Sequence, residues 1–250
     1  MKTYYKGWHA RFYNTIWRKY TACTLQAVVA MIDFAALQQV AEERGRPPCI
    51  LDAACGTGIL LKLLSEHIPT FDGYGVDASI DMLKQAQQTL RDNPHVSFQQ
   101  AALGAGETAN LPYAPGMFDL IVCTNALHYF AEPEKTLAGL GRLLAKEGQL
   151  VVEDFARRSA PFPWESFEWL MRRVDPGYVR AYTLSEARHI CTQGQLHVVQ
   201  ERAMKVDWLW RVWVLRLQRI YGIDSEPSPP PRADTRSPTP RSTTPTPTKF

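Results

Sequence analysis

Apolar runs of strand length alternate with amphipathic stretches through the middle of the chain. The apolar runs end near residues 52, 77, 98, 123 and 153, and helical patterns cover about 58–66, 79–90 and 133–148. Strands that alternate with helices predict right-handed crossovers, and therefore a mostly parallel, doubly wound α/β sheet with helices on both faces.

The pattern changes toward the carboxyl end of this region. Residues 155–182 crowd aromatic side chains and prolines together, which predicts an inserted lid in place of another strand and helix. A helical pattern over 185–192 is followed by two extended runs, at about 196–206 and 208–219. Only a short region around Asp207 separates these runs, so they predict an antiparallel hairpin that closes one edge of the sheet.

The two ends of the chain lie outside this alternation. Residues 1–46 carry aromatic side chains at helical spacing and predict a helical cap of two helices, at about 4–21 and 24–44. The central domain is predicted to span 47–222. Residues 223–250 are rich in proline, serine and threonine, bury almost nothing and are predicted to be disordered.

Composition and charge narrow the function classes. The 250 residues carry a net charge of +3, which is too small to indicate a nucleic-acid partner. No stretch of about 20 apolar residues is free of charge, so no transmembrane segment is expected. The five cysteines form no CxxC pair, so we expect reduced thiols, no metal site and a cytoplasmic location. The sequence leaves the oligomeric state open.

A glycine turn after the first predicted strand is the strongest candidate for a ligand site. Gly56 and Gly58 follow an apolar strand that ends in Asp52, and an apolar helix follows them. Glycines let the backbone approach a ligand closely, and the helix start offers free N–H groups. Leu61 stands where a dinucleotide fingerprint has its third glycine, and the turn lacks the Lys-Ser or Lys-Thr of a phosphate-binding loop.

Two carboxylates indicate which ligand the turn accepts. Asp52 beside the turn would repel a pyrophosphate but suits a ligand with an ammonium group. Asp77, about 20 residues downstream, ends the second strand and can accept hydrogen bonds from both hydroxyls of an unmodified ribose. A ribose, an amino group and no phosphate together describe S-adenosylmethionine.

The chain resembles class I S-adenosylmethionine-dependent methyltransferases, in their type-11, quinone-methylase-like branch. The matching motifs, in order, are residues 50–58, 75–79, 82–83, 111–113, 118–122, 125–130 and 148–152. The resemblance covers about 48–154, and the hairpin extends it to about 220. It implies a Rossmann-like sheet of seven strands and a methyltransferase that converts S-adenosylmethionine to S-adenosylhomocysteine.

The resemblance also implies roles for individual residues in binding the cofactor. The implied cofactor-binding residues are Asp52, Ala54, Gly56 and Gly58 around the turn, Asp77 at the ribose, Ala78, Met82, Ala102 and Leu103 at the adenine, and Asn125 beside the transferred methyl group. The chain departs from the family at Ala102, where relatives usually carry an aspartate for the adenine amino group. Glu107 is the candidate substitute.

The acceptor side is less determined by sequence. His128 follows the fourth strand and is the candidate general base, with structural packing as its alternative role and His9 and His189 as other candidates. The candidate substrate-binding residues are Tyr13, Tyr20, Tyr129 and Trp164. This aromatic excess favours a small, apolar or aromatic acceptor that takes the methyl group by direct in-line displacement of S-adenosylhomocysteine.

Two other hypotheses stay open at this point. Trp8, Trp17 and neighbouring basic residues could form an amphipathic helix, so a phospholipid headgroup N-methyltransferase in peripheral contact with a membrane is one alternative. The missing adenine aspartate favours the other, a cofactor-binding pseudoenzyme.

Overall fold

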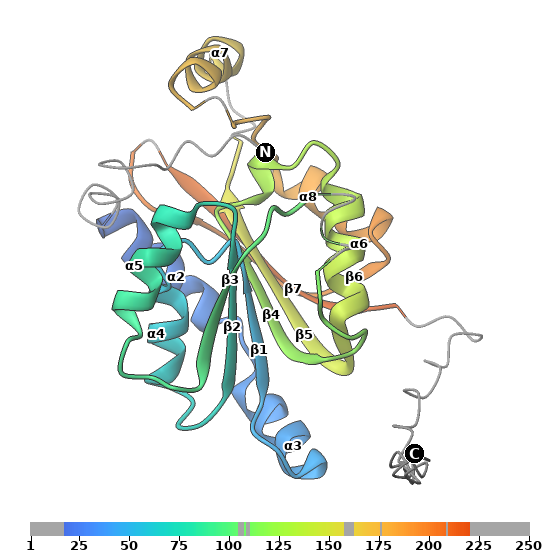
Figure 1. Ribbon diagram of the computed structural model, residues 1–250. Coiled ribbons are helices and arrows are strands. Elements are labelled where there is room, and N and C mark those ends of the chain that lie inside the picture. Colours follow the sequence, from blue (N-terminus) through green and yellow to red (C-terminus); the bar gives the residue numbers. More distant parts are fainter. Residues whose placement is uncertain are drawn as a thin grey trace, which may run out of the picture. The chain divides into compact units, whose positions relative to one another are not determined.

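Seven strands form one sheet in the order β3-β2-β1-β4-β5-β7-β6 (Figure 1). In this computed structural model, residues 18–104, 108, 111–157, 163–175, 177–208 and 210–220 are described. The strands are β1 (Cys49–Ala53), β2 (Asp72–Asp77), β3 (Val96–Gln100), β4 (Phe118–Thr124), β5 (Leu144–Phe155), β6 (Leu196–Lys205) and β7 (Arg211–Arg219). β1 to β5 pair in parallel, and β7 runs antiparallel to both β5 and β6. The doubly wound sheet and its terminal antiparallel hairpin are confirmed.

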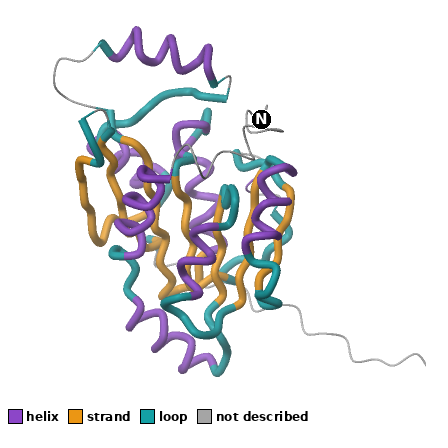
Figure 2. Tube along the Cα trace, turned by 90° about the vertical axis from the view of Figure 1, so that its left-hand side faces the viewer, coloured by secondary structure: helices purple, strands orange, loops and turns teal. Residues whose placement is uncertain are grey.

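Helices cover both faces of the sheet (Figures 1 and 2). They are α2 (Arg18–Val29), α3 (Phe34–Arg44), α4 (Ile59–Ser65), α5 (Ile80–Thr89), α6 (Pro133–Leu143), α7 (Trp164–Val174) and α8 (Leu184–Gln193), with a short 3-10 turn η2 (Leu127–Tyr129). Side chains of α2, α3 and α4 share one apolar core, and those of α6 and α8 share the other. The central strands are buried on both faces, as parallel strands between helices should be.

The N-terminal helices divide at a different place from the sequence prediction. The predicted second helix over 24–44 is wrong as one element, because the chain breaks between α2 and α3. Asp33 caps α3 by accepting the N–H of Ala36 at 3.1 Å. The buried Gln149 then clamps the break, since its side chain accepts from Asp33 N at 2.9 Å and donates to Asp33 O at 2.8 Å. Gln149, more than 100 residues away in sequence, thus determines where α2 and α3 are separated.

The helix predicted over 133–148 is also too long. α6 ends at Leu143 and β5 begins at once, because Leu144 pairs with Phe118 across an irregular register at the start of β4.

The predicted lid contains α7, which lies beyond the carboxyl ends of the parallel strands in both views (Figures 1 and 2). The tail 223–250, and most of the predicted helix 4–21, lie outside the described residues.

The described part of the chain contains no single helix that is long and apolar enough to cross a membrane. The helical segments Lys19–Val29 and Phe34–Arg44 reach the length and apolar composition of a membrane span only when they are taken together, and the chain bends by 58° between them. Apolar side chains of both halves pack into the core on the sheet.

Asp119 joins three elements at the base of the sheet. Its buried carboxylate accepts the N–H of Cys49 at 2.9 Å and pairs with Arg44 and with Arg46, the latter at 2.7 Å. The C-terminal end of α3, the start of β1 and the start of β4 are therefore held by one side chain.

We expect Asp119→Ala to lower the free energy of unfolding by about 3 kcal/mol, because it leaves two guanidinium groups and one buried N–H without their acceptor. Urea titration followed by circular dichroism measures this loss. Asp92→Ala, which removes an exposed acid beside Arg91, should change stability by less than about 0.5 kcal/mol. Equal stabilities for the two variants would contradict this role of Asp119.

Candidate active site

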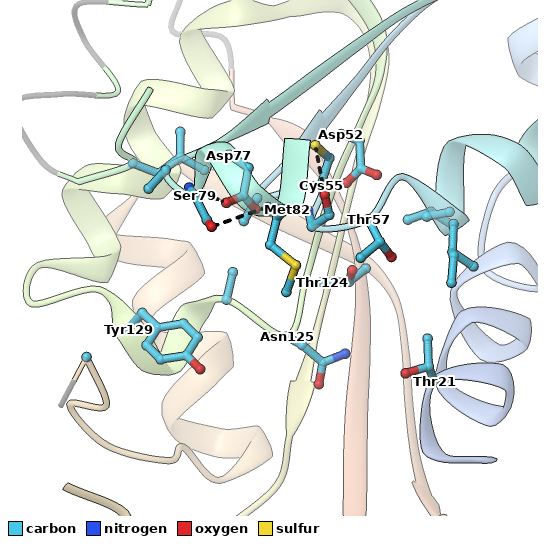
Figure 3. Close-up of a pocket in the computed structure, with 18 of the residues that line it drawn as sticks. Thr21, Asp52, Cys55, Thr57, Asp77, Ser79, Met82, Thr124, Asn125 and Tyr129 are labelled. Atoms are coloured by element: carbon cyan, nitrogen blue, oxygen red, sulfur yellow. Dashed lines mark hydrogen bonds between the residues drawn. The ribbon is translucent and has the colours of Figure 1, made fainter. Parts of the chain in front are cut away.

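The chain turns sharply between β1 and α4 through left-handed backbone conformations (Figure 3). Ala54 and Gly56 have φ angles of 66° and 52°. The N–H groups of Ala54 and Cys55 donate to the carbonyl oxygen of Val76 at 2.8 and 3.0 Å, which fixes the turn against β2. A left-handed alanine is strained, and such strain is concentrated at ligand sites.

The two glycines of the turn have different surroundings. A Cβ on Gly58 would stand 3.1 Å from the Cβ of Ala86, so this glycine allows α4 and α5 to pack closely. A Cβ on Gly56 would meet no atom within 4 Å, because Gly56 lines an open cleft. Of the two, only Gly56 is among the residues that line the cleft.

The cleft lies at the carboxyl ends of β1, β2 and β4, where open α/β sheets bind ligands. Its empty volume, open solvent at the mouth included, is about 1050 Å³. The lining residues are Thr21, Leu25, Asp52, Ala54, Cys55, Gly56, Thr57, Ile59, Leu60, Asp77, Ala78, Ser79, Met82, Leu103, Thr124, Asn125, Ala126, Tyr129, Phe130, Asp175 and Gly177.

Asp52 is a buried carboxylate at the floor of this cleft. It is 1% exposed, and neither of its oxygens has a hydrogen-bond partner among the described residues. Burial, and to a lesser extent the charge of Asp77, raises its pKa from the ordinary 3.8 to about 8. A buried carboxylate without a partner is unfavourable, so the site favours a ligand that brings a positive charge or hydrogen-bond donors.

Asp77 joins the glycine turn to the next helix. One of its oxygens accepts the N–H of Gly56 at 2.9 Å, and the other accepts the N–H of Ser79 at 2.7 Å. Burial raises the pKa of Asp77, while these backbone hydrogen bonds act in the opposite direction. Each oxygen keeps a further lone pair, so the carboxylate can still accept from two hydroxyls.

The side of the cleft predicted for adenine is mainly apolar. Ser79 caps α5, as predicted, by accepting the N–H of Met82 at 3.3 Å. Met82 and Leu103 line the cleft, whereas Ala102 is not among the lining residues. Glu107 lies outside the described residues.

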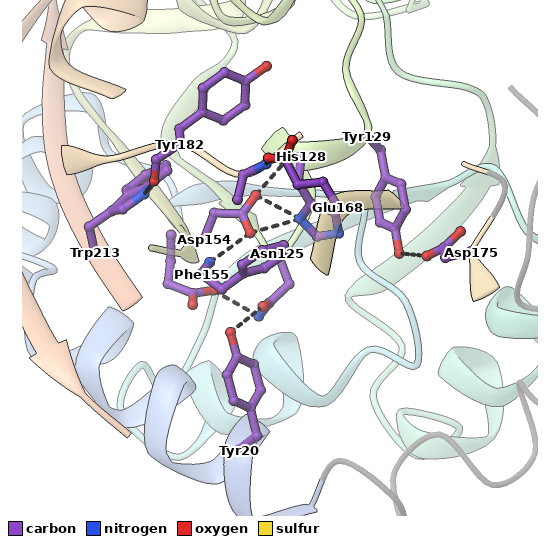
Figure 4. Close-up of polar contacts among 12 residues, drawn as sticks. Tyr20, Asn125, His128, Tyr129, Asp154, Phe155, Glu168, Asp175, Tyr182 and Trp213 are labelled. Carbon is purple, nitrogen blue, oxygen red and sulfur yellow. Dashed lines mark hydrogen bonds and ion pairs between the residues drawn. The ribbon is translucent and has the colours of Figure 1, made fainter. Parts of the chain in front are cut away.

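Asn125 sits at the opposite wall in a strained conformation, with a φ angle of 49° (Figure 4). Its side-chain amide donates to Glu153 Oε2 at 2.8 Å and accepts from the hydroxyl of Tyr20 at 2.9 Å. Burial, and then the charge of Asp154, raises the pKa of Glu153 well above its usual range. The orientation of the Asn125 amide is therefore fixed from both sides.

His128 packs behind the cleft wall. It is 6% exposed and is not among the lining residues. Its Nδ1 contacts Asp154 Oδ1 at 2.8 Å (Figure 4). The centroid of its ring lies 4.0 Å from the ring centroid of Tyr129 and 4.7 Å from that of Phe155. Since Asp154 occupies Nδ1, Nε2 is the nitrogen left for proton exchange.

The predicted substrate residues are distributed unevenly. Tyr129 lines the cleft and donates to Asp175 at 2.6 Å. Tyr20 reaches Asn125 from α2. Trp164 packs on Phe167 in the lid and is not among the lining residues, and Tyr13 lies outside the described residues.

Sequence reasoning missed the wall formed by α2 and by the end of the lid. Thr21 and Leu25 line the cleft from α2, and Asp175 and Gly177 line it from the lid. The helical pattern of 18–29 could have indicated a packed face, but no local signal shows which residues of it border a cavity. Within the described ranges, no group of three or more histidine, cysteine or acidic side chains could hold a metal ion.

Comparisons with known proteins agree with this geometry. Residues 50–148 match a family described as a methyltransferase domain. An uncharacterized methyltransferase of Bacillus subtilis, YcgJ, is 27% identical over 169 residues, covering 67% of this chain and 64% of its own length. The demethylmenaquinone methyltransferase of Thermotoga maritima is 30% identical over 106 residues, covering 42% of this chain and 43% of its own.

Solved structures share the fold at low identity. The magnesium protoporphyrin IX methyltransferase of Synechocystis PCC 6803, solved with S-adenosylhomocysteine, aligns with a TM-score of 0.61 at 17% identity, covering 87% of this chain and 97% of that one. Residues 50–148 therefore resemble a methyltransferase domain, and the chain shares the fold of a methyltransferase solved with S-adenosylhomocysteine. The chain spans less than two thirds of the length of the curated relatives it matches.

We expect Asp52→Asn to raise the thermal midpoint of the ligand-free protein at pH 8 by a few degrees. The folded state holds the proton of Asp52 more tightly than the unfolded chain does, so this group lowers stability progressively as pH rises from about 4 to about 8. Scanning fluorimetry between pH 5 and 9 should show a weaker decline for the variant than for wild type. Parallel curves for wild type, Asp52→Asn and the exposed control Asp92→Asn would contradict the raised pKa.

Proposed function

We propose that this chain transfers a methyl group from S-adenosylmethionine to a small, apolar or aromatic acceptor by direct in-line displacement. The observation that carries the proposal is the unpartnered Asp52 carboxylate beside the glycine turn. A ligand with an ammonium group would satisfy that carboxylate, and Asp77 is free to accept from ribose hydroxyls one strand away.

The chain's own residues would divide the binding work. Asp52 and the backbone of Ala54 and Gly56 would hold the methionine end, and Asp77 the ribose. Ala78, Met82 and Leu103 line the cleft where the adenine would pack. The bound sulfonium supplies an electrophilic methyl group, so the protein needs mainly to align the acceptor and exclude water.

Asn125 is the proposed positioning residue at the methyl-transfer end. Its amide is fixed by Glu153 and Tyr20, so it presents a rigid polar edge to the cleft. Tyr129 and Phe130 border the same end and would contact the acceptor. An aromatic border favours a flat apolar acceptor, and two relatives are named demethylmenaquinone methyltransferases.

His128 is proposed as the general base for an acceptor that must lose a proton. Asp154 would fix the tautomer and stabilise the charged imidazole, leaving Nε2 to take the proton. Because His128 lies behind the lining residues, this role requires the lid to move or the acceptor to enter from the aromatic side. Of the residues that suggested a membrane-surface enzyme, Trp8, Arg11 and Trp17 lie outside the described residues, and Arg18 and Lys19 begin α2.

Calorimetric titration with S-adenosylmethionine tests the proposal. We expect binding that tightens by up to about tenfold per pH unit between pH 6 and 8, because a cation must displace the proton held by Asp52. Asp52→Asn should weaken binding at least about tenfold and remove most of this pH dependence. Asp92→Asn is the matched control. Absence of binding to wild type at millimolar ligand would contradict the proposal, and binding without turnover on quinol, phenol, thioester and amine acceptors would favour the pseudoenzyme.

His128→Ala separates the base from the cofactor site. We expect kcat to fall by about a hundredfold and affinity for S-adenosylmethionine to stay within about twofold. His189→Ala, on the exposed face of α8, should leave both unchanged. An unchanged kcat in His128→Ala would show that this histidine only packs.

A further inference from the structure

A second groove lies between α8 and the end of the β6–β7 hairpin, away from the cleft. Its empty volume, counted to the mouth, is about 1030 Å³, and none of its lining residues belongs to the cleft. Thr183 and Ser185 border it at the start of α8, and Ala156 and Arg157 border it from the end of β5. Ala203 and Met204 from β6 and Val212 from β7 also border it.

The charged side chains of this groove all have the same sign. Arg157, Arg188, Lys205 and Arg211 line it, and no acidic residue does so in the described part of the chain. Arg188 is already matched by Glu201, through contacts of 2.5 and 2.8 Å. Lys205 and Arg211 therefore face the groove without a carboxylate that matches them among the described residues, and Arg157 shares the charge of Glu186 with Arg180.

The hairpin places two of these cations directly against each other. Lys205 and Arg211 are opposite partners in the antiparallel register of β6 and β7, so their side chains leave the same face of the sheet. Trp213 lies two residues from Arg211 and packs in the core beside α6 and α8, which identifies that face as the one covered by α8. Opposed like charges destabilise a strand pair unless something between them carries the opposite sign.

Nearby acids do not neutralise this arrangement. Glu186, in the first turn of α8, is held by the capping box with Thr183 and by Arg180. The start of α8 adds its own partial positive charge to the groove. Arg157 also stacks toward Trp164, with its guanidinium carbon 6.0 Å from the ring centroid, so its head is held at the lid side of the groove.

We propose that this groove binds a phosphate-bearing ligand, with Lys205 and Arg211 gripping the phosphate from the hairpin and Arg157 closing on it from the end of β5. Several converging cations, one of them a planar guanidinium next to an aromatic ring, suit a multiply charged oxyanion better than a single carboxylate. The phosphate belongs either to a separate ligand or to a remote part of the methyl acceptor.

Binding of inorganic pyrophosphate to the full chain, without cofactor, tests the proposal. We expect pyrophosphate to raise the thermal midpoint by roughly 2–4 °C relative to sodium chloride at equal ionic strength. The double variant Lys205→Gln/Arg211→Gln should lose at least about tenfold in affinity. In chloride its midpoint should equal or exceed that of wild type, because the opposed charges are gone. Arg202→Gln, on the other face of β6, is the matched control and should respond like wild type.

Two outcomes would overturn the proposal: an unchanged pyrophosphate response in the double variant, or an equal loss in Arg202→Gln, which would reveal only a general effect of charge. If only the double variant loses pyrophosphate binding, a second experiment identifies the molecule that carries the phosphate. It measures whether pyrophosphate inhibits methyl transfer by the wild-type chain. Competition with the acceptor places the phosphate on the acceptor, and absence of competition assigns it to a separate ligand. The binding experiment needs no turnover, so its failure is distinct from failure of the proposed methyl transfer.

Discussion

The binding cleft depends on the burial of one carboxylate, that of Asp52, away from solvent. Asp52 is the second-last residue of β1, a strand that is buried on both faces, and no group in the described part of the chain donates a hydrogen bond to its oxygens. Burial of a charge is unfavourable by several kcal/mol unless it is paired or protonated, so the ligand-free protein holds the proton instead. The same burial strengthens the interaction with an incoming cation. Water does not compete for a carboxylate that is shielded from solvent.

Hydrogen bonds and ion pairs between polar side chains far apart in sequence join the helices and strands around that site. Gln149 fixes the chain break at Asp33, and Asp119 ties Arg46 to the start of β1. Glu153 reaches Asn125 in the same manner. Each is a buried group with a partner on another element, although Oε1 of Glu153 has none among the described residues, so these contacts specify how the elements meet more than they add to stability.

The alternation of strands and helices, the glycine turn and the cap at Ser79 could be predicted from sequence because each is a local signal. Asp52 and Asp77 could be placed in one site because the carboxyl ends of adjacent parallel strands converge. The break at residues 30–33 and the early end of α6 could not, since Gln149 and the pairing of Leu144 decide them from elsewhere in the chain. The wall formed by Thr21 and Asp175 depends on tertiary packing alone.

The end of β5 shows how tightly the two halves of the molecule are linked. Glu153 and Asp154 are consecutive, so the pleat sends the first toward α2 and Asn125 and the second toward η2 and His128. One strand thus supplies an acid to each layer of helices. Insertion or deletion of a single residue upstream in β5 would exchange the two acids between layers and disconnect both networks at once, whereas a change of length in the lid after Phe155 would leave both acids on their own faces.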